Sequence, residues 1–341
     1  MFVKILSIVL IIFNPLFLAF FHRPSAENIA ATENKNAAEI ETAELPLSQS
    51  LKDAANPSLA SLISGLMVSA NGQANPDFLP IRDWSVEEPD IEAKAALVFG
   101  SQNDKILYQK NIEEALPIAS LTKLMTALII LENADPEQIA AISKKDIEAY
   151  GDIGNLVVDE KISVKNLLYI ALLESSNDAA AALASSINLG ASLPFGSEAP
   201  KFESFVFLMN QKAEELGLKN THFIDPTGYS PQNVSTALDL AKLVKYTFIQ
   251  PLLWEILKTQ SIDLQSADGK INHHLVNNNQ LLRLSKAIGG KTGYTEEAGG
   301  CIILVTQTPK GDYLISVILG SEERFSEMEK LVNWVEKAYL W

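Results

Sequence analysis

The chain has 341 residues, of which 47% are hydrophobic, and its formal net charge is −15 with an isoelectric point near 4.8. A chain of this length and composition can bury a substantial core in one large domain or two smaller ones, so it is not a disordered protein. Affinity for nucleic acid comes from clustered Lys and Arg, and the sequence has no such basic stretch, which argues against a nucleic-acid partner.

The first 24 residues are typical of an export signal. Lys4 is followed by a mostly apolar run from Ile5 to Phe21, with the positive charge near its start. The run is at the short end for a membrane span, about 17 residues, and no pair of small residues typical of a cleavage site closes it. We therefore expect residues 1–24 to be a membrane anchor, which places the protein in the cell envelope, on the extracytoplasmic face of the cytoplasmic membrane. If the signal is cleaved, the protein is secreted.

The composition of residues 25–83 predicts a disordered acidic linker. They are rich in Ala, Glu, Asn, Ser and Pro, and they have too few large apolar side chains to offset the entropy lost on ordering. The folded domain is predicted to begin near Trp84 and to run through residues 84–341.

The pattern within this domain changes from strands to helices and back. Apolar residues 96–100, a Ser-Gln-Asn-Asp turn and residues 106–108 predict a β-hairpin. Helical periodicity follows, and strands return near the C-terminus before a final amphipathic helix. The predicted helices cover residues 120–133, 163–174, 202–217 and 235–248, and the late strands are "GGKTGYT", "CIILVTQT" and "YLISVILG". This order predicts an α+β fold, in which an antiparallel sheet built from both ends of the domain is flanked by helices and a mostly helical subdomain is inserted.

Ser120 and Lys123 stand at the start of the first predicted helix. A serine hydroxyl is a poor nucleophile until a base takes its proton. Positions i and i+3 share one face of a helix, so Lys123 can reach Ser120 Oγ. Free backbone N–H groups at the helix start also favour a nucleophile there. Taken alone, however, so short a pattern favours a helix-start serine beside an exposed lysine.

Two further motifs follow the first along the chain. Ser175-Ser176-Asn177 lies between two helical stretches, where a capping or loop role is the simplest interpretation. Gly289-Gly290-Lys291-Thr292-Gly293 looks like part of a strand, and its glycines permit close approach of a ligand to the backbone. Without the other motifs it would be read as an ordinary glycine-rich strand.

The three motifs together are far more specific than any one of them. S-x-x-K, an S-x-N element and K-T-G in this order are the signature of class A β-lactamases and penicillin-binding proteins. With the segments "SSNDAAAALA", "STALDLAKL", "NNNQLL" and "GGKTGYTEEAGGC", the chain from about Ala93 onward resembles the low-molecular-mass penicillin-binding proteins that are serine D-alanyl-D-alanine carboxypeptidases. The resemblance covers about three quarters of the sequence. It implies the DD-peptidase/β-lactamase-like fold.

The resemblance also implies catalytic roles. Ser120 would attack the carbonyl of the D-Ala-D-Ala bond while Lys123 takes its proton, and Ser175 would pass a proton to the departing D-alanine. Asn177 would bind the amide of the substrate, and Thr292 with Arg324 would bind its terminal carboxylate. The N–H groups of Tyr294 and Ser120 would form an oxyanion hole. Lys291, beside Ser175, and Gly293 complete the set of residues implied to bind substrate.

The electrostatics of such a site can be anticipated. Lys123 must be unprotonated to act as a base, and both burial and a nearby cationic Lys291 would lower its pKa. Lys291 and Arg324 would also supply local positive charge for an anionic peptide C-terminus in an otherwise acidic protein.

The expected function is therefore removal of the terminal D-alanine from peptidoglycan stem peptides through an acyl-enzyme, with β-lactams as inhibitors. No cofactor or metal is expected: His22 and His222 are isolated, and adjacent His273 and His274 cannot both face one ion from a strand. Asp225, in the segment Asp-Pro-Thr-Gly-Tyr, could act as an acid or base, but a turn role before a proline is favoured.

Three alternatives remain open. A DD-endopeptidase that cuts cross-links would share all of these residues. A β-lactamase would need a glutamate acting through a water, and no Glu-x-x-Leu-Asn element lies between Asn177 and Lys291. An inactive peptidoglycan-binding protein would usually have lost the Ser or Lys that this chain keeps.

Overall fold

A computed structural model of the protein describes residues 80–148, 155–187 and 201–341. The predicted anchor, 1–24, and the predicted linker as far as residue 79 lie outside these residues. In the part that is described, no helix is both long and apolar enough to cross a membrane. Strand pairing begins before the expected boundary at Trp84, because β1 (Ile81–Arg82) pairs with β13 (Tyr339–Leu340). Residues 81–83 thus belong to the folded domain and not to the linker.

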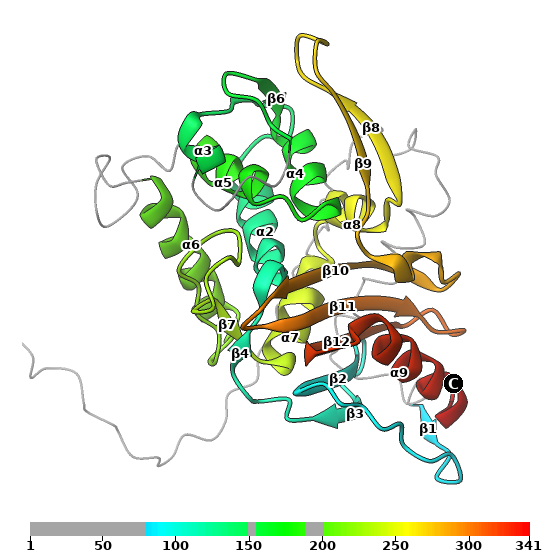
Figure 1. Ribbon diagram of the computed structural model, residues 1–341. Helices are drawn as coiled ribbons and strands as arrows, with labels where there is room; N and C mark the ends of the chain where they lie inside the picture. The colour runs from blue at the N-terminus through cyan, green and yellow to red at the C-terminus, as the bar shows by residue number, and fades with distance from the viewer. Residues whose placement is uncertain (1–79, 149–154, 188–200) are drawn as a thin grey trace, which may run out of the picture. The chain divides into compact units, whose positions relative to one another are not determined.

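A five-stranded antiparallel sheet joins the two ends of the domain (Figure 1). Its order is β10-β11-β12-β2-β3, and β12 pairs antiparallel with β2. The predicted hairpin is β2-β3. The bounds are β2 (Ala95–Gly100), β3 (Ile106–Lys110), β10 (Ala287–Thr295), β11 (Gly299–Gln307) and β12 (Tyr313–Ser321). The predicted α+β architecture, with a sheet built from both ends of the domain, is confirmed.

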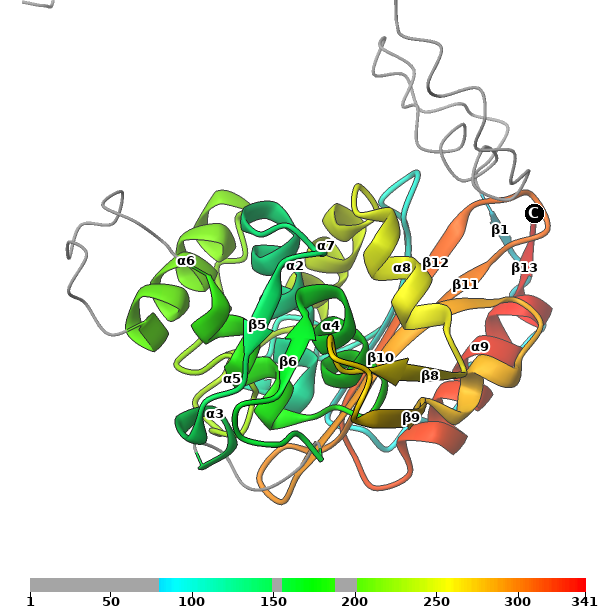
Figure 2. The same ribbon diagram turned by 90° about the horizontal axis from the view of Figure 1, so that it is seen from above.

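Both faces of this sheet are buried. Successive side chains of a strand point to opposite faces, so Leu97 joins the core shared with the helical body whereas Val98 joins the core beneath α9 (Arg324–Ala338). Figure 2 shows α9 on one side of the sheet, and α7 (Ala237–Thr247) and α8 (Pro251–Lys258) on the other. Burial on both faces explains why β11 and β12 are continuous apolar runs in the sequence.

The helical part of the domain is built around α2. From Lys123 to Ile130 every residue of α2 is buried, as expected for a helix that is apolar all round. The helices are α2 (Lys123–Asn133), α3 (Lys144–Glu148), α4 (Val164–Leu173), α5 (Asn177–Ser186) and α6 (Lys201–Glu215). Short strand pairs connect them: β4 (Leu116–Pro117) with β7 (Val234–Ser235), and β5 (Ile139–Ala141) with β6 (Lys161–Ser163).

Three local features differ from the sequence prediction. The helix expected over 120–133 begins as a separate 3₁₀ turn, η3 (Ala119–Thr122), before α2. Helix α8 was not predicted, although a proline at its first position is a common start signal. The hairpin β8 (Ser261–Gln265) and β9 (Asn272–Val276) was also missed. Only Leu264 and Leu275 of that hairpin are buried apolar residues, so its alternation is too sparse to stand out.

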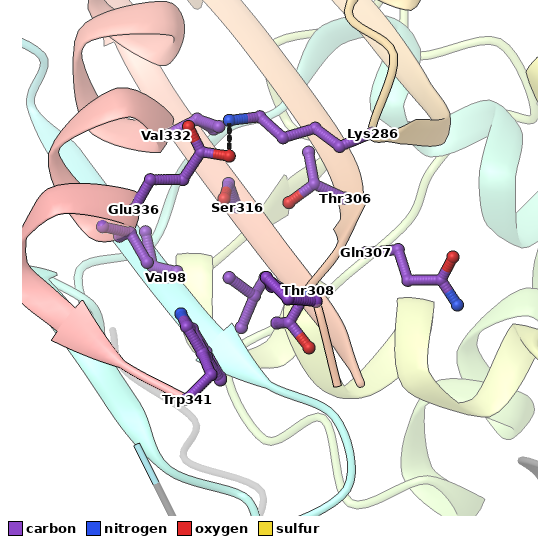
Figure 3. A pocket seen from close by; sticks show the side chains of 12 residues that line it. Val98, Lys286, Thr306, Gln307, Thr308, Ser316, Val332, Glu336 and Trp341 are labelled. Atoms are coloured by element: carbon purple, nitrogen blue, oxygen red, sulfur yellow. Dashed lines mark ion pairs between the residues drawn. The ribbon is translucent and has the colours of Figure 1, made fainter. Parts of the chain in front are cut away.

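A small pocket lies where α9 meets the sheet (Figure 3). Lys286 and Glu336 form an ion pair beside it, and Trp341 closes one end. None of the residues predicted for catalysis or substrate binding lines this pocket.

The central position of α2 predicts a large loss of stability when its core face is truncated. Leu128 is fully buried, so Leu128→Ala should lower the free energy of unfolding by about 2–5 kcal/mol. Val157 is 51% exposed, and Val157→Ala should change it by about 0.5 kcal/mol or less. Denaturation by urea measures both; equal, small effects would contradict the assignment of α2 to the core.

Candidate active site

Ser120 lies in the turn η3, directly ahead of α2. The preceding residue, Ala119, has a positive φ of 46°, a conformation that costs energy for a residue with a Cβ. This turn leaves Ser120 lining a cleft while the next turn enters the core. Lys123, the first residue of α2, is 1% exposed, and its Nζ lies 2.9 Å from Ser120 Oγ. Nucleophile and amine are thus within hydrogen-bonding distance.

Two more oxygen atoms surround the Lys123 amine. Nζ donates to Asn177 Oδ1 at 2.8 Å and to the carbonyl oxygen of Thr227 at 2.7 Å. A neutral amine has two N–H groups and one lone pair, so these two acceptors use both N–H groups. The lone pair then faces Ser120 Oγ. This arrangement is the one in which the hydroxyl can give its proton to the amine.

Burial favours the neutral form of the Lys123 amine. It lowers the pKa of Lys123 to about 7, against the opposing effect of the negative charges of Asp225 and Asp178. Near neutral pH a substantial share of Lys123 is therefore unprotonated. The expected lowering by burial is found in the structure.

Lys291 is a second buried amine close enough to Lys123 for the two charged forms to repel each other. Lys291 is also buried, and burial first, then the charges of Lys123 and Arg324, hold its pKa well below the usual lysine value. Each charged amine favours the neutral form of the other, because like charges repel each other equally, and burial is the largest cause of the lowered pKa of both. Arg324 adds a guanidinium that keeps its positive charge.

Ser175 occupies the corner between α4 and α5. It has a positive φ of 66°, and Lys291 Nζ lies 2.8 Å from its Oγ. Lys291 also donates to the carbonyl of Thr292 at 2.8 Å. The next residue, Ser176, caps α5 by accepting from the N–H of Ala179. The Ser-Ser-Asn motif is thus both a helix cap, as its simplest interpretation had it, and part of the cleft.

The glycines around Lys291 allow close packing of the backbone. A Cβ at Gly293 would lie 2.9 Å from the backbone nitrogen of Ser120, and one at Gly290 would lie 2.3 Å from the carbonyl oxygen of Ile303. The sequence interpretation assigned this close approach to a ligand. In the structure, the groups that approach are the protein's own backbone atoms.

Arg324, the first residue of α9, reaches across to β10. Its Nη1 donates to the carbonyl of Gly293 at 3.0 Å, and the guanidinium lies over the rings of Tyr294 and Phe325. Tyr294 itself is 63% exposed. Aromatic contact and the hydrogen bond hold the cation at one end of the cleft.

The cleft has a volume of about 970 Å³. It brings together the predicted residues Ser120, Ser175, Asn177, Thr292, Gly293, Tyr294 and Arg324, whereas Lys123 and Lys291 lie buried behind it and reach it through their amines. Sequence reasoning missed the carbonyl of Thr227, because a backbone group leaves no signature in the residue type. It also missed Glu174 and Tyr229, which line the same cleft.

Comparison with known proteins agrees with this geometry. A sequence model of the D-alanyl-D-alanine carboxypeptidase family, peptidase S11, matches residues 83–323. The chain belongs to this family. It is 32% identical over 290 residues to a D-alanyl-D-alanine endopeptidase of Pseudomonas aeruginosa, covering 82% of this chain and 87% of that protein. It is 35% identical over 267 residues to the D-alanyl-D-alanine carboxypeptidase DacF of Bacillus subtilis, covering 73% of this chain and 63% of that protein.

A solved structure extends the comparison to the fold. The DD-transpeptidase of Streptomyces K15 superposes with a TM-score of 0.67 at 30% identity, covering 74% of this chain and all of that one. This peptidase S11 member therefore has the fold shared by DD-peptidases and β-lactamases, and it is a serine DD-peptidase.

The pKa of Lys123 predicts how acylation of this DD-peptidase depends on pH. Protonated Lys123 has no lone pair, so the acylation rate should fall about tenfold per pH unit below a midpoint near pH 7. The rate of labelling by a fluorescent penicillin, measured between pH 5 and 9, gives this profile.

Two variants serve as references for this profile. Lys123→Met should abolish labelling at every pH. Lys212→Met removes a lysine paired with Glu132 and Glu215 on α2 and α6, and it should keep the wild-type profile. A wild-type rate that stayed constant down to pH 5 would contradict the role of Lys123.

Proposed function

We propose that the protein is a serine D-alanyl-D-alanine carboxypeptidase that trims the terminal D-alanine from peptidoglycan stem peptides. The observation that carries this proposal is the 2.9 Å contact between Ser120 Oγ and a buried lysine amine whose N–H groups are taken up by Asn177 and Thr227. Such a pair can activate a hydroxyl near neutral pH without histidine.

In the proposed acylation step, Ser120 Oγ attacks the carbonyl carbon between the two D-alanines and Lys123 takes the hydroxyl proton. The oxyanion that forms is stabilised by the backbone N–H groups of Ser120 and Tyr294. The carbon–nitrogen bond then breaks, and the departing amine receives a proton through Ser175 from Lys291, which lies 2.8 Å away. Lys123 then releases its proton to solvent and Lys291 regains one from it. The neutral Lys123 takes a proton from the water that attacks the ester and passes it to Ser120 Oγ as the ester bond breaks, which restores Ser120.

Substrate binding follows from the polar groups of the cleft. Thr292 and the guanidinium of Arg324 bind the terminal carboxylate, and the side chain of Asn177 binds the amide of the substrate. Strand β10 is the edge of its sheet, so an extended peptide can pair with it as an added strand. A bound carboxylate next to Lys291 favours its protonated form, because an opposite charge raises the pKa of an amine. Substrate binding thereby supplies the proton that the leaving group needs.

A second candidate is DD-endopeptidase activity on peptide cross-links. The cleft is open and its volume is at the upper end of the usual range for ligand sites, which leaves space for a leaving group larger than D-alanine. The Pseudomonas aeruginosa protein, matched over 87% of its length, is named for this activity.

We also propose that residues 1–24 direct the protein out of the cytoplasm and attach it to the membrane. The stretch after them would act as a tether for the domain 84–341, extended by the residues of β1. The sequence pattern supports this arrangement. It would place the cleft in the cell envelope, where peptidoglycan stem peptides and β-lactams are encountered.

Two substrates distinguish the candidate activities. The full-length protein in detergent is incubated with a pentapeptide muropeptide and with a cross-linked dimer, and free D-alanine and released monomer are followed. Release of D-alanine from the pentapeptide supports the carboxypeptidase. Monomer release without D-alanine would replace it with the endopeptidase, and rapid destruction of penicillin without either product would indicate a β-lactamase.

Substitution of the nucleophile tests the acyl-enzyme itself. Ser120→Ala should lower D-alanine release by about 10⁴-fold or more and abolish labelling by a fluorescent penicillin. Ser230→Ala, which removes another serine that lines the cleft, should label like the wild type. Labelling that survived Ser120→Ala would overturn the proposal.

A further inference from the structure

The loop of residues 225–230 is wrapped around one buried carboxylate. Asp225 is 2% exposed. Its Oδ1 accepts from the N–H and the hydroxyl of Thr227 and from the N–H of Gly228, each at 2.7 Å, and its Oδ2 accepts from the N–H of Ser230 at 3.0 Å. Asn233 secures the other side by donating to the carbonyl of Asp225 at 3.0 Å. The turn role expected for Asp225 is thus present, and its carboxylate accepts four hydrogen bonds.

This loop packs directly on the catalytic turn and helix. The carbonyl of Thr227 accepts from Lys123 Nζ at 2.7 Å, and the carbonyl of Pro226 accepts from Thr126 Oγ1 at 2.6 Å. Gly228 has a positive φ of 82°, and a Cβ there would lie 1.9 Å from the carbonyl oxygen of Ala119. The path of the loop therefore fixes the direction from which an acceptor reaches the Lys123 amine.

We propose that Asp225 is a positioning residue for Lys123: it holds the Thr227 carbonyl on the amine, so that the lone pair faces Ser120, and it places a negative charge beside that amine. Asp225 acts through Thr227 and by its charge, and it does not touch the substrate. This inference rests on the proposed role of Lys123 as the base.

The charged groups around Lys123 can be named element by element. Asp225 faces it from the loop and Asp178 from α5, while Lys291 faces it from β10. At the far end of α2, Glu132 is paired with Lys212 of α6. Helices α4, α6 and α7 otherwise meet α2 through the shared apolar core.

The electrostatic consequence has a definite sign. Burial lowers the pKa of Lys123, and the charges of Asp225 and Asp178 pull it back up to about 7. Without the charge of Asp225, protonated Lys123 is less stabilised, so the amine loses its proton at a lower pH.

The experiment measures the pH profile of penicillin acylation for the full-length protein and Asp225→Asn. Asparagine keeps one oxygen for Thr227 and Gly228 but removes the charge and the acceptor for Ser230. The midpoint of the acidic limb should move to lower pH by about one unit, and the plateau rate above it should fall about tenfold as the carbonyl of Thr227 loses its fixed position.

Asp239→Asn is the matched control. Asp239 is equally buried and also accepts backbone and side-chain hydrogen bonds, from Asn220, Thr221 and Lys242, but it lies in the first turn of α7 and does not line the cleft. Loss of stability alone would affect both variants, whereas the midpoint should move only in Asp225→Asn. An unchanged midpoint in Asp225→Asn would overturn the inference.

Thr227→Val distinguishes the effect of Asp225 on the position of the Thr227 carbonyl from the effect of its charge. It also provides a test if Asp225→Asn does not fold. It removes the hydroxyl that donates to Asp225 and leaves the carboxylate charged. The plateau rate should fall several-fold at an unchanged midpoint, and a wild-type plateau would overturn the positioning role. Failure of the wild-type protein to be acylated would instead contradict the proposed function.

Discussion

The structure depends on the burial of one amine. Lys123 Nζ sits almost without solvent among Ser120, Asn177 and Thr227. Lowering its pKa from 10.5 to about 7 corresponds to about 5 kcal/mol against the charged form. An exposed lysine is protonated at neutral pH, so burying Lys123 in either form costs stability. Hydrogen bonds with two acceptors and one hydroxyl offset part of that cost. A site of this kind holds together only if every neighbour is fixed in place.

The fold holds these neighbours in place by bringing distant segments of the chain together at the cleft. The nucleophile turn and α2 come from the early part of the domain, the Ser175 corner and the loop 225–230 from its helical part, and β10 from the late sheet. Ala119 and Ser175 both have left-handed backbone conformations, which cost about 1–3 kcal/mol each and are retained where the surroundings over-determine them. Large apolar cores on both faces of the sheet offset this strain.

Much of this could be predicted from the sequence because the signals were local. Periodicity placed the long helices and the sheet strands, and the three motifs named the serines, lysines and asparagine that meet at the cleft. The features that could not be predicted are contacts between residues that are distant in the sequence. The acceptor at Thr227 is a backbone carbonyl, the group that crowds Gly293 is the nitrogen of Ser120, and the depth at which Lys123 and Lys291 are buried follows from how the elements pack.

A direct titration of the Lys123 side chain tests the central claim. Lysines labelled with ¹³C at Cε are followed by NMR as a function of pH, and the Lys123 signal is assigned by its loss in Lys123→Met. The account predicts a transition near pH 7 in the folded protein. A transition near the ordinary lysine value of about 10.4 would show that Lys123 is cationic at neutral pH, and it would contradict the account of Lys123 as a base.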